Sequence, residues 1–404
     1  MPAMPEAPIY LDHAATTPLR PEVLEAMLPY LQERFGNPSS AHATGRAARA
    51  ALDDARERLA RAMGAEAREI VFTSGGTESI NLALKGAAWA GKARGHRIVT
   101  SAIEHHAVGH TVRYLEKFGF EVVELPVDRY GRVDPDDVEA AVTPKTILVS
   151  VMLANNEVGT VEPIAEIGRR VRAHKGVLFH TDAVQAAPYL DLDVATLGVD
   201  LLSLAAHKFE GPKGVGALYI RHGIQVLPQQ QGGSQERFRR AGTENVAGIV
   251  GMARAYELSC RERRSTVARL RRLRDRLRNA VAAVDGVEAT GHPTERLPGL
   301  VSVIVRGVDG SAVATALDLD GLACSTGSAC LAGSDEVSHV LSAMGYPDDE
   351  ARGAVRLSLG RATTEAEIER ATELVPAAIE MQRRAAGALA ADPLGASPAA
   401  AQLP

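Results

Sequence analysis

Short apolar segments alternate with helical segments through the first two thirds of the chain. Seven of these segments are expected to be strands: residues 69–73, 97–100, 121–125, 146–151, 177–180, 201–204 and 216–220. Helices are expected between them over residues 78–90, 108–118 and 164–173. Short apolar strands alternating with helices are typical of a mostly parallel sheet that is covered on both faces. The pattern therefore predicts an α/β fold built on a large sheet of the seven-stranded type.

The pattern changes near residue 255, where one long helix is expected over residues 255–281. Its apolar side chains recur at helical spacing and comprise Val267, Leu270, Leu273, Leu277 and Val281. Two further strand-like segments follow, at residues 300–305 and 355–359, with helices between and after them. We therefore expect a large domain over 16–264, a smaller α+β domain formed by 1–15 and 265–384, and, because residues 385–404 are low in complexity, a disordered tail.

Composition and charge remove several classes of protein from consideration. The 404 residues carry a formal net charge of −5, which predicts no general attraction to nucleic acids or membranes. No run of 18 apolar residues occurs, and residues 1–8 lack the features of a secretory signal. The three cysteines, Cys260, Cys324 and Cys330, show no CxxC spacing, which argues against a disulfide framework and against a metal site. A reducing cytoplasm suits this cysteine usage.

Two segments at strand ends could bind an anionic cofactor. Gly75, Gly76 and Thr77 follow a predicted strand and open a helix, where free backbone N–H groups can bind a phosphate; a simple tight turn is the alternative. Asp182 ends another predicted strand, where α/β sheets bind their ligands. Its carboxylate could keep a cofactor ring nitrogen protonated, or it could cap the next helix.

An amine and a thiol supply candidate nucleophiles. Lys208 directly follows an apolar strand in a segment broken by Gly and Pro, so its amine could form a Schiff base with an aldehyde cofactor, or lie on a surface loop. Cys330 lies in a run of small residues, 323–334, that predicts an accessible, reactive loop cysteine. Cys324 lies closer to an apolar stretch and is expected to be packed as a small hydrophobic residue.

Together these motifs resemble the NifS/IscS-type cysteine desulfurases, a branch of the fold-type I, aspartate aminotransferase-like enzymes that use pyridoxal 5′-phosphate (PLP). The resemblance extends from Tyr10 to Arg361 and includes the segments 10–18, 35–40, 154–160 and 242–245. It implies that L-cysteine is converted to L-alanine while its sulfur passes to an enzyme cysteine as a persulfide. An acceptor then takes the sulfur, for iron–sulfur assembly, transfer-RNA thiolation or another delivery route.

The resemblance also implies roles in catalysis. Lys208 resembles the lysine that binds PLP covalently and later removes the Cα proton, and His105 the imidazole stacked on the cofactor ring. Cys330 corresponds to the persulfide-forming nucleophile. Arg356 resembles the clamp on the substrate carboxylate, and Asn155 matches a contact to cofactor and substrate.

Further positions match cofactor contacts. Asp182 resembles the partner of the ring nitrogen, and Gln185 the donor to the ring hydroxyl. The phosphate contacts correspond to Gly76, Thr77, His207 and Thr243, and Thr243 typically reaches in from the other subunit of a homodimer.

This chain departs from the family pattern at two positions beside the lysine. Ala205 stands where the family usually has a serine that donates to the phosphate, so PLP is expected to bind more weakly through this position. Glu210 stands where the family often has a tyrosine, and a carboxylate there would repel the phosphate unless it points away.

Other functions remain compatible with these residues. A transaminase or a selenocysteine lyase would share Lys208 and Asp182, although a transaminase does not need the loop around Cys330. A sulfur-relay scaffold without cofactor chemistry is the non-enzymatic alternative. Residues 261–280 carry nine arginines, which predict a solvated helix face or a docking surface for an acidic sulfur acceptor or transfer RNA.

Overall fold

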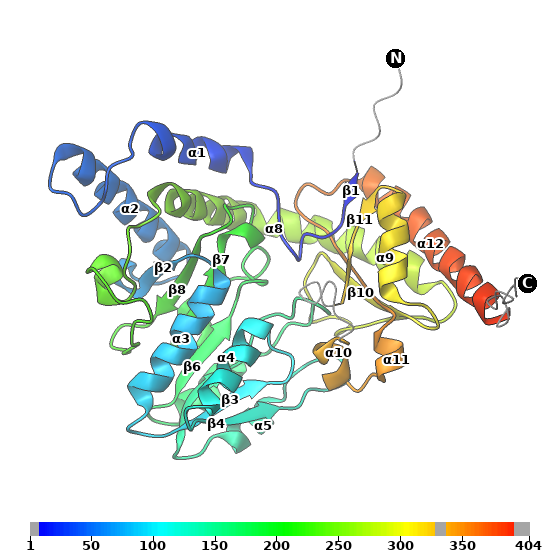
Figure 1. The fold of residues 1–404 in the computed structure, drawn as a ribbon, viewed down its shortest axis with the longest axis horizontal. Coiled ribbons are helices and arrows are strands. Elements are labelled where there is room, and N and C mark those ends of the chain that lie inside the picture. The colour runs from blue at the N-terminus through cyan, green and yellow to red at the C-terminus, as the bar shows by residue number, and fades with distance from the viewer. Residues whose placement is uncertain (1–7, 328–336, 392–404) are drawn as a thin grey trace, which may run out of the picture.

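A seven-stranded sheet forms the centre of the larger part of the computed structural model, which describes residues 8–327 and 337–391 (Figure 1). Its strands are β2 (Ile70–Thr73), β3 (Arg97–Ser101), β4 (Glu121–Leu125), β5 (Thr146–Ser150), β6 (Leu178–Asp182), β7 (Leu201–Ala205) and β8 (Gly216–Ile220). They follow the order β2-β8-β7-β6-β5-β3-β4, and β8 alone runs antiparallel to its neighbours. All seven strands expected from the sequence are confirmed, as is the mostly parallel arrangement.

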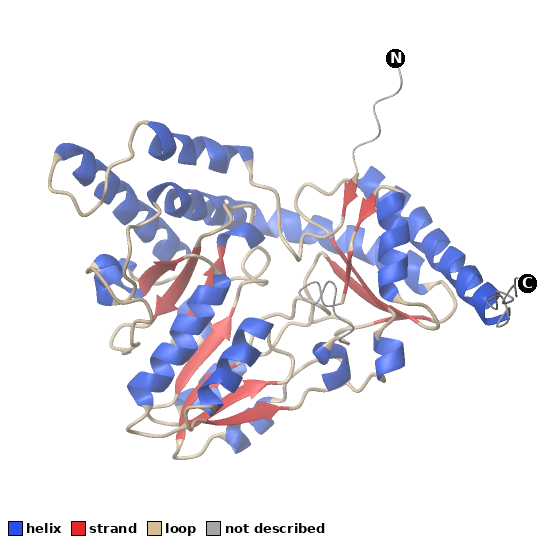
Figure 2. Cartoon of the chain, in the orientation of Figure 1, coloured by secondary structure: helices blue, strands red, loops and turns tan. Residues whose placement is uncertain are grey.

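Helices cover both faces of this sheet (Figure 2). On one face, α3 (Gly76–Gly91) and α4 (His106–Glu116) pack on alternate strand residues such as Val71 and Ile98. On the other face, α2 (Ala43–Ala62), α6 (Ile164–Arg172) and the start of α8 (Val246–Ala282) pack on residues such as Phe72. Successive strand residues point to opposite faces, so these buried strands carry apolar residues on both faces. The remaining helices before α8 are α1 (Pro21–Gln32), α5 (Pro135–Ala141), α7 (Val194–Leu197) and the 3₁₀ turns η1 (Ala67–Glu69), η2 (Ala206–Lys208) and η3 (Gln235–Phe238).

A second, smaller unit is built around four antiparallel strands in the order β12-β13-β10-β9. Its elements are β9 (Val287–Ala289), β10 (Leu300–Val305), α9 (Gly310–Leu319), β11 (Leu322–Ala323), β12 (Ser325–Thr326), α10 (His339–Ala343), α11 (Asp348–Ala351), β13 (Ala354–Ser358) and α12 (Glu365–Ala391). Strand β1 (Ile9–Tyr10) joins this unit by pairing with β11.

Helix α8 connects the two units and contributes to both of their cores. Val246 to Leu258 belong to the core of the large sheet, whereas Leu270 to Val281 belong to the core of the small unit, together with Ile9 and Leu11. The helix begins at Val246 rather than at Ala255. Its first residues are buried on every side, so their apolar pattern has no helical periodicity from which this start could be predicted. The expected boundary near residue 264 falls between these two parts of the helix and stays a prediction.

The chain end differs from the sequence-based expectation. Helix α12 continues to Ala391, so residues 385–391 are helical rather than part of a disordered tail. The segment is rich in alanine, which has the highest helix propensity of all residues, and low complexity alone is therefore a poor sign of disorder here. Residues 392–404 lie outside the described part.

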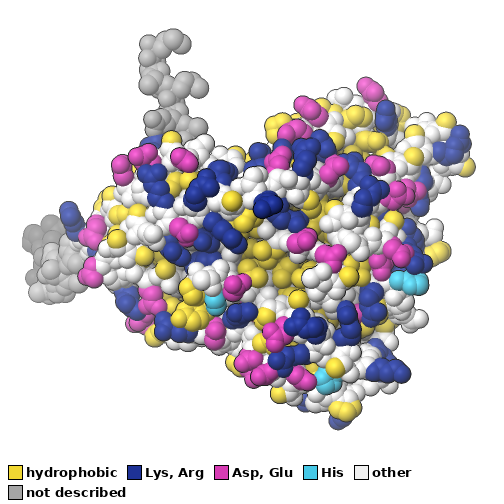
Figure 3. Space-filling model, turned by 180° about the vertical axis from the view of Figure 1, so that it is seen from behind, with side chains coloured by type: hydrophobic (Ala, Val, Ile, Leu, Met, Phe, Trp, Pro, Cys, Tyr) yellow, Lys and Arg dark blue, Asp and Glu magenta, His cyan; other side chains and the backbone are white. Residues whose placement is uncertain are grey.

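The Arg-rich half of α8 lies at the back of the molecule, where Lys and Arg side chains form a band (Figure 3). Several of its arginines have partners within the chain. Arg263 pairs with Asp191 at 3.2 Å, Arg274 with Asp275 at 2.8 Å and Arg276 with Glu369 at 3.6 Å. Arg263 and Arg276 therefore tie α8 to neighbouring segments, while docking of an acidic partner remains a prediction.

Candidate active site

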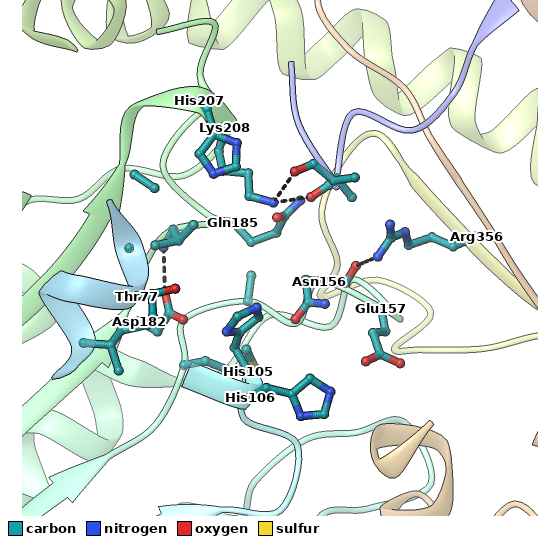
Figure 4. A pocket seen from close by; sticks show the side chains of 18 of the residues that line it. Thr77, His105, His106, Asn156, Glu157, Asp182, Gln185, His207, Lys208 and Arg356 are labelled. Carbon is teal, nitrogen blue, oxygen red and sulfur yellow. Dashed lines mark hydrogen bonds between the residues drawn. The ribbon is translucent and has the colours of Figure 1, made fainter. Parts of the chain in front are cut away.

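A cavity of about 390 Å³ lies at the carboxyl ends of the parallel strands, the usual ligand site of such sheets. The large sheet and its helices contribute Gly76, Thr77, Ile80, His105, His106, Met152, Ala154, Asn156, Glu157, Asp182, Val184, Gln185, Ala205, His207 and Lys208. The small unit and the N-terminal segment contribute Ala14, Ala15, His339 and Arg356. Figure 4 shows Asp182 and Thr77 on one side of this cavity and Arg356 on the opposite side.

Lys208 ends the 3₁₀ turn η2 that follows strand β7, and its amine extends into the cavity between these two sides (Figure 4). The Nζ atom donates hydrogen bonds to the backbone oxygens of Ala14 and Ala15, the latter at 2.9 Å. The N-terminal segment therefore holds the amine that could form a Schiff base with an aldehyde.

Asp182 is the last residue of β6 and is buried. Its Oδ1 accepts a hydrogen bond from the backbone N–H of Val184 at 2.9 Å. Burial raises the pKa of this carboxyl to about 6, against the opposing effects of that hydrogen bond and the charge of Lys208. Near neutral pH the group is an anion in a site of low polarity, and such an anion favours a cationic ring nitrogen as its partner.

His105 caps the start of α4 and lines the cavity. Its Nδ1 accepts from the backbone N–H of Ala107 at 3.0 Å, which places the proton of the neutral ring on Nε2. Burial, with the nearby charge of Lys208, lowers the pKa of His105 to about 4, so the ring is neutral at physiological pH. A neutral imidazole at this position can stack on a flat cofactor.

The neighbouring Glu104 is also buried, and burial raises its pKa to about 8. Its Oε1 accepts hydrogen bonds from Ser101 Oγ and from the backbone N–H of Met152 at 2.9 Å. The protonated carboxyl thus joins the start of α4 to the segment that follows β5.

The start of α3 offers a site for a phosphate. Gly75 precedes the helix with a φ of 155° and no side chain caps its first N–H groups. A Cβ at Gly76 would lie 2.9 Å from Val184 Cγ2, so a larger residue here would have to displace a side chain that lines the cavity. Thr77 and His207 line the same end, and the His207 ring contacts Thr16 Oγ1 at 3.2 Å.

Ala205 ends strand β7 at this phosphate end and lines the cavity. Its methyl group provides no hydrogen-bond donor, in agreement with the departure noted in the sequence.

Arg356 on β13 forms the opposite side of the cavity and is almost completely buried. Its Nη2 pairs with Asp12 Oδ1 at 3.0 Å and its Nη1 donates to the backbone oxygen of Asn156 at 3.1 Å. Its Nε has no partner among the described residues. The guanidinium is therefore held by its surroundings and keeps a donor for a carboxylate.

Asn155 does not line the cavity, whereas its neighbour Asn156 does. Asn155 is fully buried; its amide donates to the backbone oxygen of Ile103 at 3.0 Å and accepts from the N–H groups of Glu157 and Val158. These bonds shape the loop and leave the Asn155 side chain no access to a ligand. The sequence motif contains both asparagines in succession, and only the backbone direction decides which one reaches the site.

One expected residue lies away from the cavity of this single chain, and another cannot be placed. Thr243 is exposed on the surface and does not line the cavity. Cys330 lies outside the described residues. Cys324 packs against the core of the small unit, and burial raises the pKa of its thiol to about 12, which makes it a poor nucleophile, as expected.

Glu210, the second departure from the family pattern, points away from the phosphate end. Its carboxylate pairs with Arg361 Nε at 2.6 Å and lines a separate cavity of about 30 Å³. The expected repulsion of a phosphate is thus relieved, because the carboxylate points away from the phosphate end and its charge is paired with Arg361.

Several lining residues were not identified from the sequence. His106, Glu157 and His339 line the cavity, and the rings of His106 and His339 lie 4.7 Å apart. The backbone oxygens of Ala14 and Ala15 carry no sequence signal at all. The histidine pair next to Glu104 was visible in the sequence, but the contact with His339 depends on the approach of α10.

These groups fit PLP. The amine, the buried anion, the neutral imidazole and the open helix start meet in one cavity, and the buried Oε1 of Gln185 has no partner among the described residues. Lys208 would hold the aldehyde, Asp182 the ring nitrogen, Gln185 the ring hydroxyl, and Gly76, Thr77 and His207 the phosphate.

Comparison with known proteins identifies the family of the chain. The model of the aminotransferase class-V family matches residues 9–371. A protein of Methanosarcina thermophila named cysteine desulfurase IscS is 50% identical over 375 residues, which are 93% of each chain. Another protein of that name, from Dictyoglomus turgidum, is 50% identical over 376 residues, or 93% of this chain and 95% of its own.

A solved structure shares the fold. A NifS-like protein superposes with a TM-score of 0.88 at 39% identity, covering 93% of this chain and all of its own. The fold and the resemblance expected from the sequence are thereby confirmed, and enzymes of this kind depend on PLP. The chain belongs to the class-V aminotransferase family.

Proposed function

We propose that this protein is a PLP-dependent cysteine desulfurase that converts L-cysteine to L-alanine and passes the sulfur to Cys330. The observation that carries the proposal is the single cavity that unites Lys208, Asp182 and His105 with the guanidinium of Arg356. The relatives named cysteine desulfurase, at 50% identity over almost the whole chain, support the same reaction.

The cofactor end of the cavity comprises Lys208, Asp182, His105 and the start of α3. Its side chains would hold the cofactor and move protons. Bound PLP supplies an electron-withdrawing ring that makes the Cα proton of an attached amino acid acidic. Asp182 would hold the ring nitrogen by its negative charge, and His105 would contact the ring as a neutral imidazole. The Lys208 amine takes the proton from Cα and later returns it.

The substrate end fixes the amino acid by its carboxylate. Arg356 offers its unpartnered Nε, while Asp12 and the Asn156 backbone hold its other nitrogens in place. We assign the neighbouring side-chain contact to Asn156, because it lines the cavity and Asn155 does not.

Transfer of the sulfur requires a thiolate that the protein supplies, separate from the cofactor. The Cys330 thiolate attacks the substrate sulfur, so that an S–S bond forms as the Cβ–S bond breaks. The electron pair of the broken bond goes to Cβ, which takes up a proton to become the methyl group of alanine. Cys330 is left as a persulfide, from which an acceptor removes the outer sulfur.

The working enzyme is a homodimer in this proposal. Leu24, Leu28 and Leu31 lie on one face of α1 and are exposed, and Phe35 follows at the same spacing. A second copy that covers this face would also bring its exposed Thr243 to the phosphate end.

Among the described residues no helix has both the length and the hydrophobicity needed to cross a bilayer. We place the enzyme in the cytoplasm, where thiols stay reduced.

The decisive experiment compares two variants of the purified protein. Cys330→Ala should abolish release of alanine from L-cysteine, since no thiol takes the sulfur, but should keep the visible absorbance of the bound cofactor. Lys208→Ala should lose both alanine release and the borohydride-reducible bond to the cofactor. Alanine release and cofactor absorbance are measured on the same samples.

A matched control separates the competing functions. Cys324→Ala removes the other thiol of the same segment and should leave turnover unchanged, because that thiol is packed and protonated. Undiminished alanine release by Cys330→Ala would contradict the role of this thiol. A keto acid formed from L-cysteine with its sulfur retained would favour a transaminase, and protein that binds no PLP would favour a sulfur-relay scaffold. The acceptor can be identified by trapping a mixed disulfide on Cys330.

A further inference from the structure

Glu210 adopts a backbone conformation that non-glycine residues rarely take. Its φ is 62°, in the left-handed region, and it lies two residues after Lys208. An L-residue with a side chain of this size stays in that region only where its contacts compensate for the strain. Contacts must therefore hold Glu210 in this conformation. The left-handed position is taken by Glu210 and not by glycine, although Gly211 is the next residue.

These contacts tie Glu210 to distant parts of the chain. Its N–H donates to Thr17 Oγ1 at 2.8 Å, and its backbone oxygen accepts from the N–H of Arg20 at 3.1 Å. Its carboxylate accepts from Arg361 Nε at 2.6 Å, and the carboxylate side chain is only 14% exposed. The backbone is thus bound to the N-terminal segment and the side chain to the small unit.

Arg361 is itself fixed to the strand that carries Arg356. It follows β13 after only two residues, and the N–H of Leu359 donates to Gly299 at 2.7 Å. The backbone oxygen of Arg361 accepts from Arg269 of α8. Motion of β13 relative to the lysine turn must therefore stretch or break the pair of Glu210 and Arg361.

We propose that Glu210 is a positioning residue that, through its ion pair with Arg361, sets the separation between Lys208 and the carboxylate clamp Arg356. The proposal rests on the function proposed above, because it takes Lys208 as the cofactor lysine and Arg356 as the substrate clamp. The pair lies behind the reacting groups, in the small cavity that Lys208, Glu210 and Arg361 line together. It touches neither cofactor nor substrate.

Other charges near the pair define what its loss would do. Arg20 forms a salt bridge with Glu262 at 2.8 Å and another with Glu22 at 2.9 Å. The hydrogen bond from Arg20, with the nearby charge of Arg361, lowers the pKa of Glu262. Without the Glu210 charge, Arg361 would be drawn toward Glu262 and away from the lysine turn.

The test compares Glu210→Gln with wild type as the PLP-loaded enzyme. The glutamine keeps the size of the side chain and removes its charge. KM for L-cysteine should rise by about three- to tenfold, the range for a partly buried ion pair, with kcat changed less than twofold. The visible absorbance should stay unchanged, because Lys208 still carries the cofactor.

Glu22→Gln is the matched control. It removes a carboxylate from the same charge network, but one that contacts Arg20 rather than Arg361. Its KM should equal that of wild type. Arg361→Lys, which keeps a cation beside Glu210, should restore most of the substrate affinity lost in Arg361→Gln.

Two outcomes would overturn the proposal. One is a Glu210→Gln enzyme with wild-type KM, whatever its melting temperature, because a purely structural pair changes only stability. The other is an equal KM for L-cysteine in Arg361→Lys and Arg361→Gln. These two variants test the same ion pair from its other side, in case Glu210→Gln does not fold. Wild-type enzyme that releases no alanine would instead contradict the proposed function; the dissociation constant of L-cysteine, from its spectral change, would then still report on the pair.

Discussion

The cofactor end and the substrate end of the cavity are built from different parts of the chain. At the cofactor end, Asp182, Lys208 and the start of α3 each lie at or just beyond the end of a strand of the large sheet. At the substrate end, Arg356 comes from the small unit, Asp12 from the N-terminal segment and Asn156 from the loop after β5. One end is a property of parallel strands, and the other depends on the docking of two units.

This difference has a physical consequence. Residues at neighbouring strand ends are brought together by the sheet itself, so their spacing is rigid. The Arg356 clamp is buried and depends on a carboxylate 344 residues away in sequence, so its placement depends on long-range packing. Changes at the cofactor end should therefore alter chemistry, and changes at the substrate end should alter substrate affinity.

The largest effect is expected from Asp182→Asn at the cofactor end. The amide cannot hold a positive ring nitrogen, so kcat should fall roughly 100- to 1,000-fold, as for other losses of a preorganised charge. KM for L-cysteine should change little. Steady-state alanine formation measures both constants, and a raised KM with normal kcat would remove the distinction between the two ends.

The same residue predicts a dependence of cofactor binding on pH. Burial raises the pKa of Asp182 to about 6 in the ligand-free protein, so the carboxyl becomes neutral as the pH falls below that value. PLP affinity should therefore weaken below pH 6 in wild type, and this step should be missing in Asp182→Asn. Fluorescence titration with PLP at several pH values gives the comparison.

A smaller effect is expected from Arg356→Lys at the substrate end. Lysine keeps the charge but loses the planar donor pair, and a charge-assisted hydrogen bond contributes about 1.5–3 kcal/mol, so KM should rise about 10- to 100-fold. The absorbance of bound PLP should be unchanged. Loss of PLP from this variant would show that the two ends are not independent.

The smallest effect is a gain, in Ala205→Ser. A hydroxyl at the end of β7 would restore one donor to the phosphate and should tighten PLP binding about tenfold. Substrate KM should not move, because Ala205 lies at the cofactor end. Ala206→Ser, one residue further along the chain at a buried position that does not line the cavity, serves as the control and should bring no such gain.

Much of the cofactor end could be predicted because its signals are local. A strand followed by Gly75-Gly76-Thr77, by Asp182 or by Lys208 places each group at the same edge of the sheet. The choice of Asn156 over Asn155 could not be made in this way, because adjacent residues carry the same chemistry and point in different directions. The alanine-rich segment 385–391 could not be assigned from the sequence either, since composition alone does not distinguish a helix from a disordered tail.

The sequence by itself determined the alternation of strands and helices, and it supplied the candidates for holding PLP and for receiving sulfur, because these depend on local pattern and side-chain chemistry. Only the tertiary structure decided that Asp12 holds Arg356, that Glu210 turns toward Arg361, and that Ala14 and Ala15 bind the lysine amine. Such contacts join segments far apart in the chain, and they form only when the packing of both cores has fixed where each backbone runs.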